Sequence, residues 1–133
     1  MNQVNRFAPL LGRILLALIF LVSGLGKIFD WQGTAGYMAS KGMPLIPFFL
    51  LGAILLELAG GLAVLLGFKA RIGAVLLIVF LIPATLIFHN FWTLTGMERQ
   101  IQMVMFLKNL AIMGGLLLVV GLGPGPLSLD EKR

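Results

Sequence analysis

The sequence predicts an all-α fold, a bundle of four transmembrane helices with the N and C termini in the cytoplasm. Of its 133 residues, 59% are hydrophobic and only 11% are charged, and the mean hydropathy is +1.05. A soluble domain carries roughly 25% charged residues, so the solvent for this chain is a bilayer. The apolar residues also gather in four runs, and the positive charges lie at the ends of these runs. We therefore expect one integral membrane domain over residues 1–133.

The four apolar runs cover residues 10–29, 48–68, 72–88 and 103–122. Each is about long enough to cross a hydrocarbon core of ~30 Å as a helix that rises ~1.5 Å per residue. Since a chain in lipid must satisfy its own backbone hydrogen bonds, four runs of this length indicate helices rather than the strands of a barrel.

The basic residues predict the orientation. Three positively charged residues lie on the outer side and six lie on the inner side. The inner six are Arg6, Arg13, Lys69, Arg71, Lys132 and Arg133, and Arg71 belongs to a tight basic turn. This asymmetry places both termini in the cytoplasm. It also accounts for the net charge of +5. We therefore expect the bilayer, and no nucleic acid, as a partner.

The segments outside the runs differ in character. The first outer connection is long and mildly amphipathic, and we expect a short interfacial helix in it that starts at Gly33 or Thr34 and ends by Gly42 and Pro44. This helix would lie on the membrane surface and partly cover the outer end of the bundle. The tail, residues 123–133, is rich in turn residues and is expected to be flexible and loosely ordered.

Two glycine pairs lie inside the runs. Gly60 and Gly61 begin the string GGLAVLLG, and Gly114 and Gly115 begin the similar string GGLLLVVG. The match indicates either an internal repeat or no more than a shared apolar composition. In either case we expect the glycines to let helix backbones approach closely, as small residues do in membranes.

Several polar residues interrupt the runs. Arg13 lies near the inner end of the first run and is expected to snorkel to the interface, and Lys27, in the last outer turn, either snorkels or pairs. Glu57 is ten residues from both Pro47 and Gly67, so its short side chain cannot reach either surface. It is either a structural carboxyl that locks helix packing or a functional residue.

Three further polar residues lie toward the outer side. His89 follows the third run, in which Pro83 weakens the helix, and it is either an interfacial residue or part of a site. Because the chain has one histidine, it cannot build a bis-histidine haem site, and we expect neither haem nor metal. Lys108 and Asn109 lie about two turns into the fourth run and point ~100° apart, so they face different neighbours.

These positions converge in the outer half of the bundle, with at least one from each helix: Lys27, Glu57, His89, Lys108 and Asn109. Helix bundles hold ligands between facing helices. A cluster of bases and one acid among apolar side chains would suit an amphipathic molecule with a polar head, and it would also suit proton movement. We expect Glu57 to neutralise either Lys108 or Lys27.

Several motifs carry a family resemblance. The strings are SGLGKI, GTAGYMASKGMP, LLELAGGLAVLLGF, IFHNF, MFLKNLAIMGGLLL and GPG, at residues 23–28, 33–44, 55–68, 87–91, 105–118 and 123–125. In this order and spacing the chain resembles the DoxX family of small bacterial inner-membrane proteins, and within it the YqjF-like subgroup. The resemblance runs from about Arg13 to Asp130.

The resemblance implies a four-helix bundle in a bacterial inner membrane. Some members of the family are associated with quinone-linked sulfur oxidation or with oxidative-stress complexes. The resemblance implies that the family's polar positions in this chain are Arg13, Lys27, Glu57, His89, Lys108 and Asn109. It does not imply what role each of them has. Because the chain has no cysteine, the thiol-relay roles suggested for some members do not fit it.

Three functions remain open. In the first, the bundle binds a quinone as the membrane subunit of an oxidoreductase or oxidative-stress system, with a membrane or soluble redox partner, and a lipid-open groove lies near Lys27, Glu57 and Lys108. In the second, it is a structural or assembly protein that can form homo-oligomers. All of its charges are then paired, and the bundle contains no cavity. A transporter ranks last, because the inner halves of the runs offer few polar residues for a path.

Overall fold

The chain is all-α. A computed structural model describes residues 2–132, and the elements are helices α1 (Gln3–Phe29), α2 (Trp31–Ser40), α3 (Ile46–Leu66), α4 (Ala70–Phe88) and α5 (Gly96–Leu122), with short 3₁₀ helices η1 (Phe91–Thr93) and η2 (Leu129–Lys132). Four helices of this described range are long and apolar enough to cross a membrane: α1, α3, α4 with the segment after it, and α5. The predicted fold class is confirmed, whereas the orientation of the termini stays a prediction.

Two of the long helices are longer than the apolar runs. Helices α1 and α5 have 27 residues each and begin about two turns before their runs. At the start of α1, the side chain of Asn2 accepts a hydrogen bond of 2.8 Å from the backbone N–H of Asn5, which caps the helix in a polar segment. The difference arises because hydropathy marks the part of a helix that suits lipid, while the hydrogen-bonded helix continues into water.

The expected short helix is present as α2, although it begins two or three residues earlier than expected. Asp30 caps it, since the Asp30 carboxylate accepts a hydrogen bond of 3.1 Å from the backbone N–H of Gly33. The helix ends at Ser40, and Gly42 follows with a φ of +73°, a conformation that glycine adopts readily.

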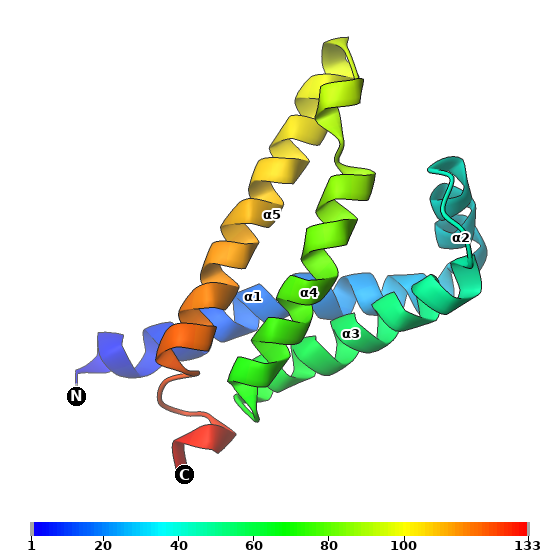
Figure 1. The fold of residues 1–133 in the computed structure, drawn as a ribbon. Coiled ribbons are helices and arrows are strands. Elements are labelled where there is room, and N and C mark those ends of the chain that lie inside the picture. The colour runs from blue at the N-terminus through cyan, green and yellow to red at the C-terminus, as the bar shows by residue number, and fades with distance from the viewer. Residues whose placement is uncertain (1, 133) are drawn as a thin grey trace.

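The long helices form two pairs. Helix α1 packs along α3, α4 packs along α5, and α3 also packs against α4 next to their tight turn. Figure 1 shows the two pairs meeting at one end and diverging toward the other. The first, which holds both termini, is named the basic end after Arg6, Arg13, Lys69 and Arg71 (Figure 1). The other is named the aromatic end after Trp31, Tyr37, Phe88, Phe91 and Trp92.

The glycine pairs behave differently from each other. A Cβ at Gly60 would lie 2.7 Å from Leu77 of α4, and a Cβ at Gly61 would lie 3.0 Å from Leu21 of α1, so both glycines permit close helix packing as expected. In contrast, a Cβ at Gly114 would meet nothing within 4 Å, and one at Gly115 would make only ordinary contacts. The expectation of close approach is therefore wrong for the second pair within this chain.

The apolar core lies where the pairs meet. All four long helices contribute side chains, and its buried members are Ala17, Phe20, Val64, Ala70, Ala74, Leu77, Leu81, Leu116 and Val119. A second, smaller cluster joins α2 to α3 through Met38, Leu50 and Ile54. Phe88 at the end of α4 also packs against this second cluster.

Arg13 does not snorkel, in contrast to expectation. Its side chain is buried, with 3% of the residue exposed, and its guanidinium donates to two backbone carbonyls, those of Leu65 (3.2 Å) and Leu127 (2.8 Å). The first carbonyl lies in the last turn of α3, which has orphan acceptors, and the second belongs to the tail. These two carbonyls give the guanidinium hydrogen-bond partners inside the protein, so the side chain does not need to reach water at the membrane surface.

Polar contacts that the sequence did not predict join the tail to the bundle, while its flexibility stays a prediction. The carboxylate of Asp130 accepts hydrogen bonds from the backbone N–H groups of Lys69 (2.8 Å) and Ala70 (2.9 Å), and so it caps the start of α4. The guanidinium of Arg71 lies beside the Gly123 backbone. These partners are about 50 to 60 positions away in the sequence, and a local reading of turn residues does not find them.

Candidate functional site

A cavity of about 410 Å³ lies between the two helix pairs, in the half of the bundle near the aromatic end. It is partly open, and its lining is mostly apolar, with residues from α1, α2, α3, α4 and α5. All five polar residues that the sequence suggested for a site line it: Lys27, Glu57, His89, Lys108 and Asn109.

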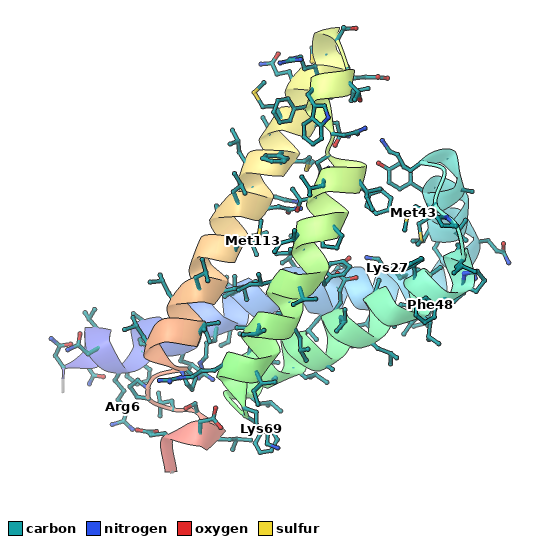
Figure 2. The ribbon with its side chains drawn as sticks, in the orientation of Figure 1. Arg6, Lys27, Met43, Phe48, Lys69 and Met113 are labelled. Carbon is teal, nitrogen blue, oxygen red and sulfur yellow. The ribbon has the colours of Figure 1, made fainter. Side chains whose placement is uncertain are left out.

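The central feature is an ion pair between α1 and α3. Lys27 Nζ lies 2.6 Å from Glu57 Oε1, and the side chains are 20% and 3% exposed, respectively. The same amine donates a hydrogen bond of 2.7 Å to Ser23 Oγ, one turn back on α1. Oε1 lacks a well-aligned hydrogen bond within residues 2–132, so charge attraction rather than a directed bond holds it. Figure 2 shows Lys27 in the wedge between α3 and α4.

Local sequence explains why this pair forms. A Cβ at Gly24 would lie 2.7 Å from Leu58 and 3.4 Å from the Cβ of Glu57, so glycine lets α1 approach α3 at the level of the carboxylate. Lys27 follows Gly24 by three positions and therefore lies on the same face of α1. The sequence reasoning missed the roles of Ser23 and Gly24, although the quoted motif SGLGKI contains both and the i, i+4 spacing of Ser23 and Lys27 was readable.

Asn109 is buried and bound. Its side-chain amide donates a hydrogen bond of 3.0 Å to Thr85 Oγ1 of α4, and both residues are almost completely inaccessible. This bond joins α4 to α5 at the back of the cavity. Thr85 was not suggested as a site residue, and a threonine in an apolar run gives no signal of its own until its partner is known.

His89 ends α4 and lies at the mouth of the cavity. Its ring Nδ1 lies 2.7 Å from Gln102 Oε1 of α5. An amide oxygen only accepts hydrogen bonds, so Nδ1 carries the proton in this contact, and in the tautomer protonated at Nδ1 the other ring nitrogen, Nε2, can accept a hydrogen bond. Gln102 lies just before the fourth apolar run and was missed for that reason. Pro83, which lies before His89 on the same helix, does not line the cavity, and α4 continues through it.

Lys108 is the polar residue without a partner. It lines the cavity and is exposed, and in the described part of the chain it makes no hydrogen bond or ion pair. The sequence left open whether Lys27 or Lys108 pairs with Glu57, and the structure answers that it is Lys27. Of the other positions suggested as structural, Arg13, Arg71 and both glycine pairs lie outside the cavity lining.

The aromatic end closes over part of this region. Tyr37 of α2 stacks on Phe88 of α4, and both line the cavity. Lys41, just after α2, donates a hydrogen bond of 3.3 Å to Asn90 Oδ1, just after α4. Helix α2 therefore bridges the diverging helix pairs above the ion pair.

Comparison with known proteins places the chain in a family. The sequence model of the DoxX family matches residues 8–90, more than half of the chain. The chain belongs to the DoxX family. Inner membrane protein YqjF of Escherichia coli (strain K12) is 38% identical to this DoxX protein over 131 residues, covering 98% of this chain and 95% of YqjF. Inner membrane protein YphA of the same organism is 37% identical over 123 residues, covering 92% and 88%.

A second family also matches. The sequence model of the SURF4 family covers residues 54–133 of this DoxX protein. Surfeit locus protein 4 homolog of Drosophila melanogaster is 31% identical over 134 residues, which cover 99% of this chain but only 43% of that protein. No solved structure matches the chain. With inner-membrane relatives and four apolar helices, this DoxX protein is a multi-pass inner-membrane protein, as predicted.

Proposed function

We propose that this DoxX protein binds the head group of a quinone in the cavity between its two helix pairs, as the membrane subunit of an oxidoreductase or oxidative-stress system. The observation that carries the proposal is the cavity of about 410 Å³ itself, with apolar walls and three kinds of polar group converging on one region. Sites for small molecules have this character, and they span roughly 300 to 1,000 Å³.

Each polar group has a use in such a site. Lys108 is an unpaired donor for a quinone oxygen, and Nε2 of His89, in the tautomer that donates through Nδ1, is an acceptor for a quinol hydroxyl. Glu57 holds a proton-accepting carboxylate beside the Lys27 amine. Reduction of a quinone to a quinol takes up two electrons and two protons, and these side chains can position the head and move the protons. The electrons come from a partner protein or a soluble substrate, because these side chains carry none.

The partly open shape of the cavity also supports a ligand that is dissolved in lipid. The helix pairs diverge toward the aromatic end (Figure 1), and large apolar side chains cover the outside of the bundle. Toward the basic end, the buried core of all four helices follows the cavity, and its members are apolar. This favours a binding site over a transport path.

The main alternative is a structural or assembly protein. The buried Lys27–Glu57 pair is consistent with this alternative, because such a pair fixes the packing of α1 on α3. That alternative expects a sealed cluster with every charge paired. The unpaired Lys108 and the cavity around it favour a ligand instead.

The test is to purify the protein in nanodiscs, extract bound small molecules and identify them by ultraviolet spectroscopy and mass spectrometry. We expect a stoichiometric quinone in the wild type. It should be lost in Ala53→Phe, which fills the cavity, and kept in Ala59→Phe, which places the same ring on the exposed face of α3. Wild-type protein that carries no quinone and does not bind an added short-tailed benzoquinone would refute the proposal.

A further inference from the structure

We propose that Lys108 forms an anion subsite in this cavity, so that the preferred ligand is an amphiphile whose head group is an acid that is ionised at neutral pH. The inference rests on the proposed function in one respect: it takes the cavity to be a ligand site. It adds the charge of the ligand, which the proposed function leaves open.

The charges that face the cavity do not balance. Its titratable lining consists of Lys27, Tyr37, Glu57, His89 and Lys108, and the phenol of Tyr37 adds no charge at neutral pH. Lys27 and Glu57 are in contact and neutralise each other. His89 is occupied by Gln102 through Nδ1 and adds no negative charge. Lys108 therefore leaves the cavity with one uncompensated positive charge.

The other acids of the chain are placed elsewhere. The chain has five acidic residues. Asp30 caps α2, and Asp130 and Glu131 belong to the tail at the basic end. Glu98 lies in the first turn of α5, ten residues before Lys108 and so about 15 Å away along the helix axis. The counter-charge for Lys108 must therefore come from outside the chain.

The position of Lys108 makes a counter-charge valuable. It is exposed next to Asn109, which is buried against Thr85, and Ile112, one turn further on, lines the same cavity. An ammonium group among apolar side chains in a membrane is costly unless it is paired. A charge-assisted hydrogen bond to an anion is also about twice as strong as a bond between neutral groups.

The shape of the cavity restricts the rest of the ligand. Its walls are mostly apolar, and its volume of about 410 Å³ holds a head group with the first part of an alkyl chain. The chemistry that fits is a single ionised oxygen acid joined to an apolar body. A long-chain carboxylate and the anion of a hydroxyquinone share this chemistry, and the experiment distinguishes them.

The experiment measures binding of four probes to the full chain in nanodiscs of phosphatidylcholine, with empty nanodiscs as the reference for partitioning. The probes are an alkyl hydroxynaphthoquinone, the same naphthoquinone without the hydroxyl, a long-chain carboxylic acid and its matching alcohol. We expect at least one acid to bind about tenfold to a hundredfold more tightly than its neutral counterpart. Lys108→Gln should remove this preference, and Lys108→Arg should keep it.

The matched control is Arg99→Gln, which removes a positive charge from an exposed position on the same helix, α5, outside the cavity lining. It should leave the preference for the acid unchanged, and unfolding temperatures confirm that each variant is folded. Equal binding of acids and neutral probes by wild type, or a preference that survives Lys108→Gln, overturns the inference.

The two proposals can fail separately. If both naphthoquinones bind equally well and the carboxylic acid binds no more tightly than its alcohol, the anion subsite is refuted and the quinone proposal stands. If the carboxylic acid binds through Lys108 and neither naphthoquinone binds, the quinone proposal is refuted and the anion subsite stands.

Discussion

Tyr37 of α2 stacks on Phe88 of α4, with ring centroids 5.3 Å apart and an angle of 24° between the ring planes. This contact joins the two helix pairs at the end where their backbones diverge (Figure 1). Together with the bond from Lys41 to Asn90, it makes α2 a bridge over one side of the cavity.

Removal of the stacked ring should loosen this bridge. Aromatic pairs contribute about 0.5–1.5 kcal/mol beyond their buried area, so Tyr37→Ala should broaden the distribution of distances between α2 and η1, whereas Tyr37→Phe should not. The chain has no cysteine, so spin labels at Ala39→Cys and Thr93→Cys report this distance without background. Identical distributions in wild type and Tyr37→Ala would show that other contacts hold α2.

The Lys27–Glu57 pair should show strong coupling in a double-mutant cycle. Removing one member of a buried pair leaves an uncompensated charge and costs about 3–5 kcal/mol, so Glu57→Gln and Lys27→Met should each lower stability by about that amount. The double variant should be more stable than the sum of the single effects predicts. Reversible unfolding in detergent or bicelles measures this, and simple additivity would contradict the pairing.

Arg13 should prove to be a structural residue of the basic end. Arg13→Met removes the donors to the carbonyls of Leu65 and Leu127, so it should destabilise the protein by about 2 kcal/mol or more and increase hydrogen exchange in residues 124–130. Arg6→Met is the matched control, because Arg6 is exposed near the same end. Equal effects of the two substitutions would mean that the tail is held without Arg13.

The glycine pairs give a direct comparison. Gly60→Ala would bring a Cβ to 2.7 Å from Leu77 and 3.1 Å from the backbone oxygen of Gly73, and overpacking of this kind costs about 1–3 kcal/mol. Gly114→Ala meets open space and should leave stability unchanged or raise it by up to about 1 kcal/mol. Unfolding temperatures of the two variants test the difference, and a reversed order would contradict the packing described for α3 and α4.

The orientation in the membrane is a separate prediction. Both termini lie at the basic end (Figure 1), and the excess of Lys and Arg there predicts that this end faces the cytoplasm. Reporter fusions at either terminus should therefore be active only with a cytoplasmic reporter. Single cysteines placed at Thr93 should react with a membrane-impermeant reagent added outside the inner membrane, and the opposite pattern would invert the topology.

The sequence alone determined the fold class, the number of spans and three helix ends. A bilayer rewards long apolar runs and requires helices, so composition and run length suffice to find the spans, and the helices end at Phe29, Phe88 and Leu122 as expected. The depth of a residue in the membrane also follows from its position along a span. The sequence could therefore group the five polar residues that line one cavity.

Only the tertiary structure decided which of these groups meet. Lys27 and Lys108 were both candidates for the partner of Glu57, and the close approach of α1 to α3 at Gly24 selected Lys27. Arg13 is buried and does not reach the membrane surface, because its guanidinium donates a hydrogen bond to a carbonyl of the tail, more than 100 positions away. Helical spacing fixes depth and face within one helix, whereas partners on other helices depend on how the helices rotate and pack against each other.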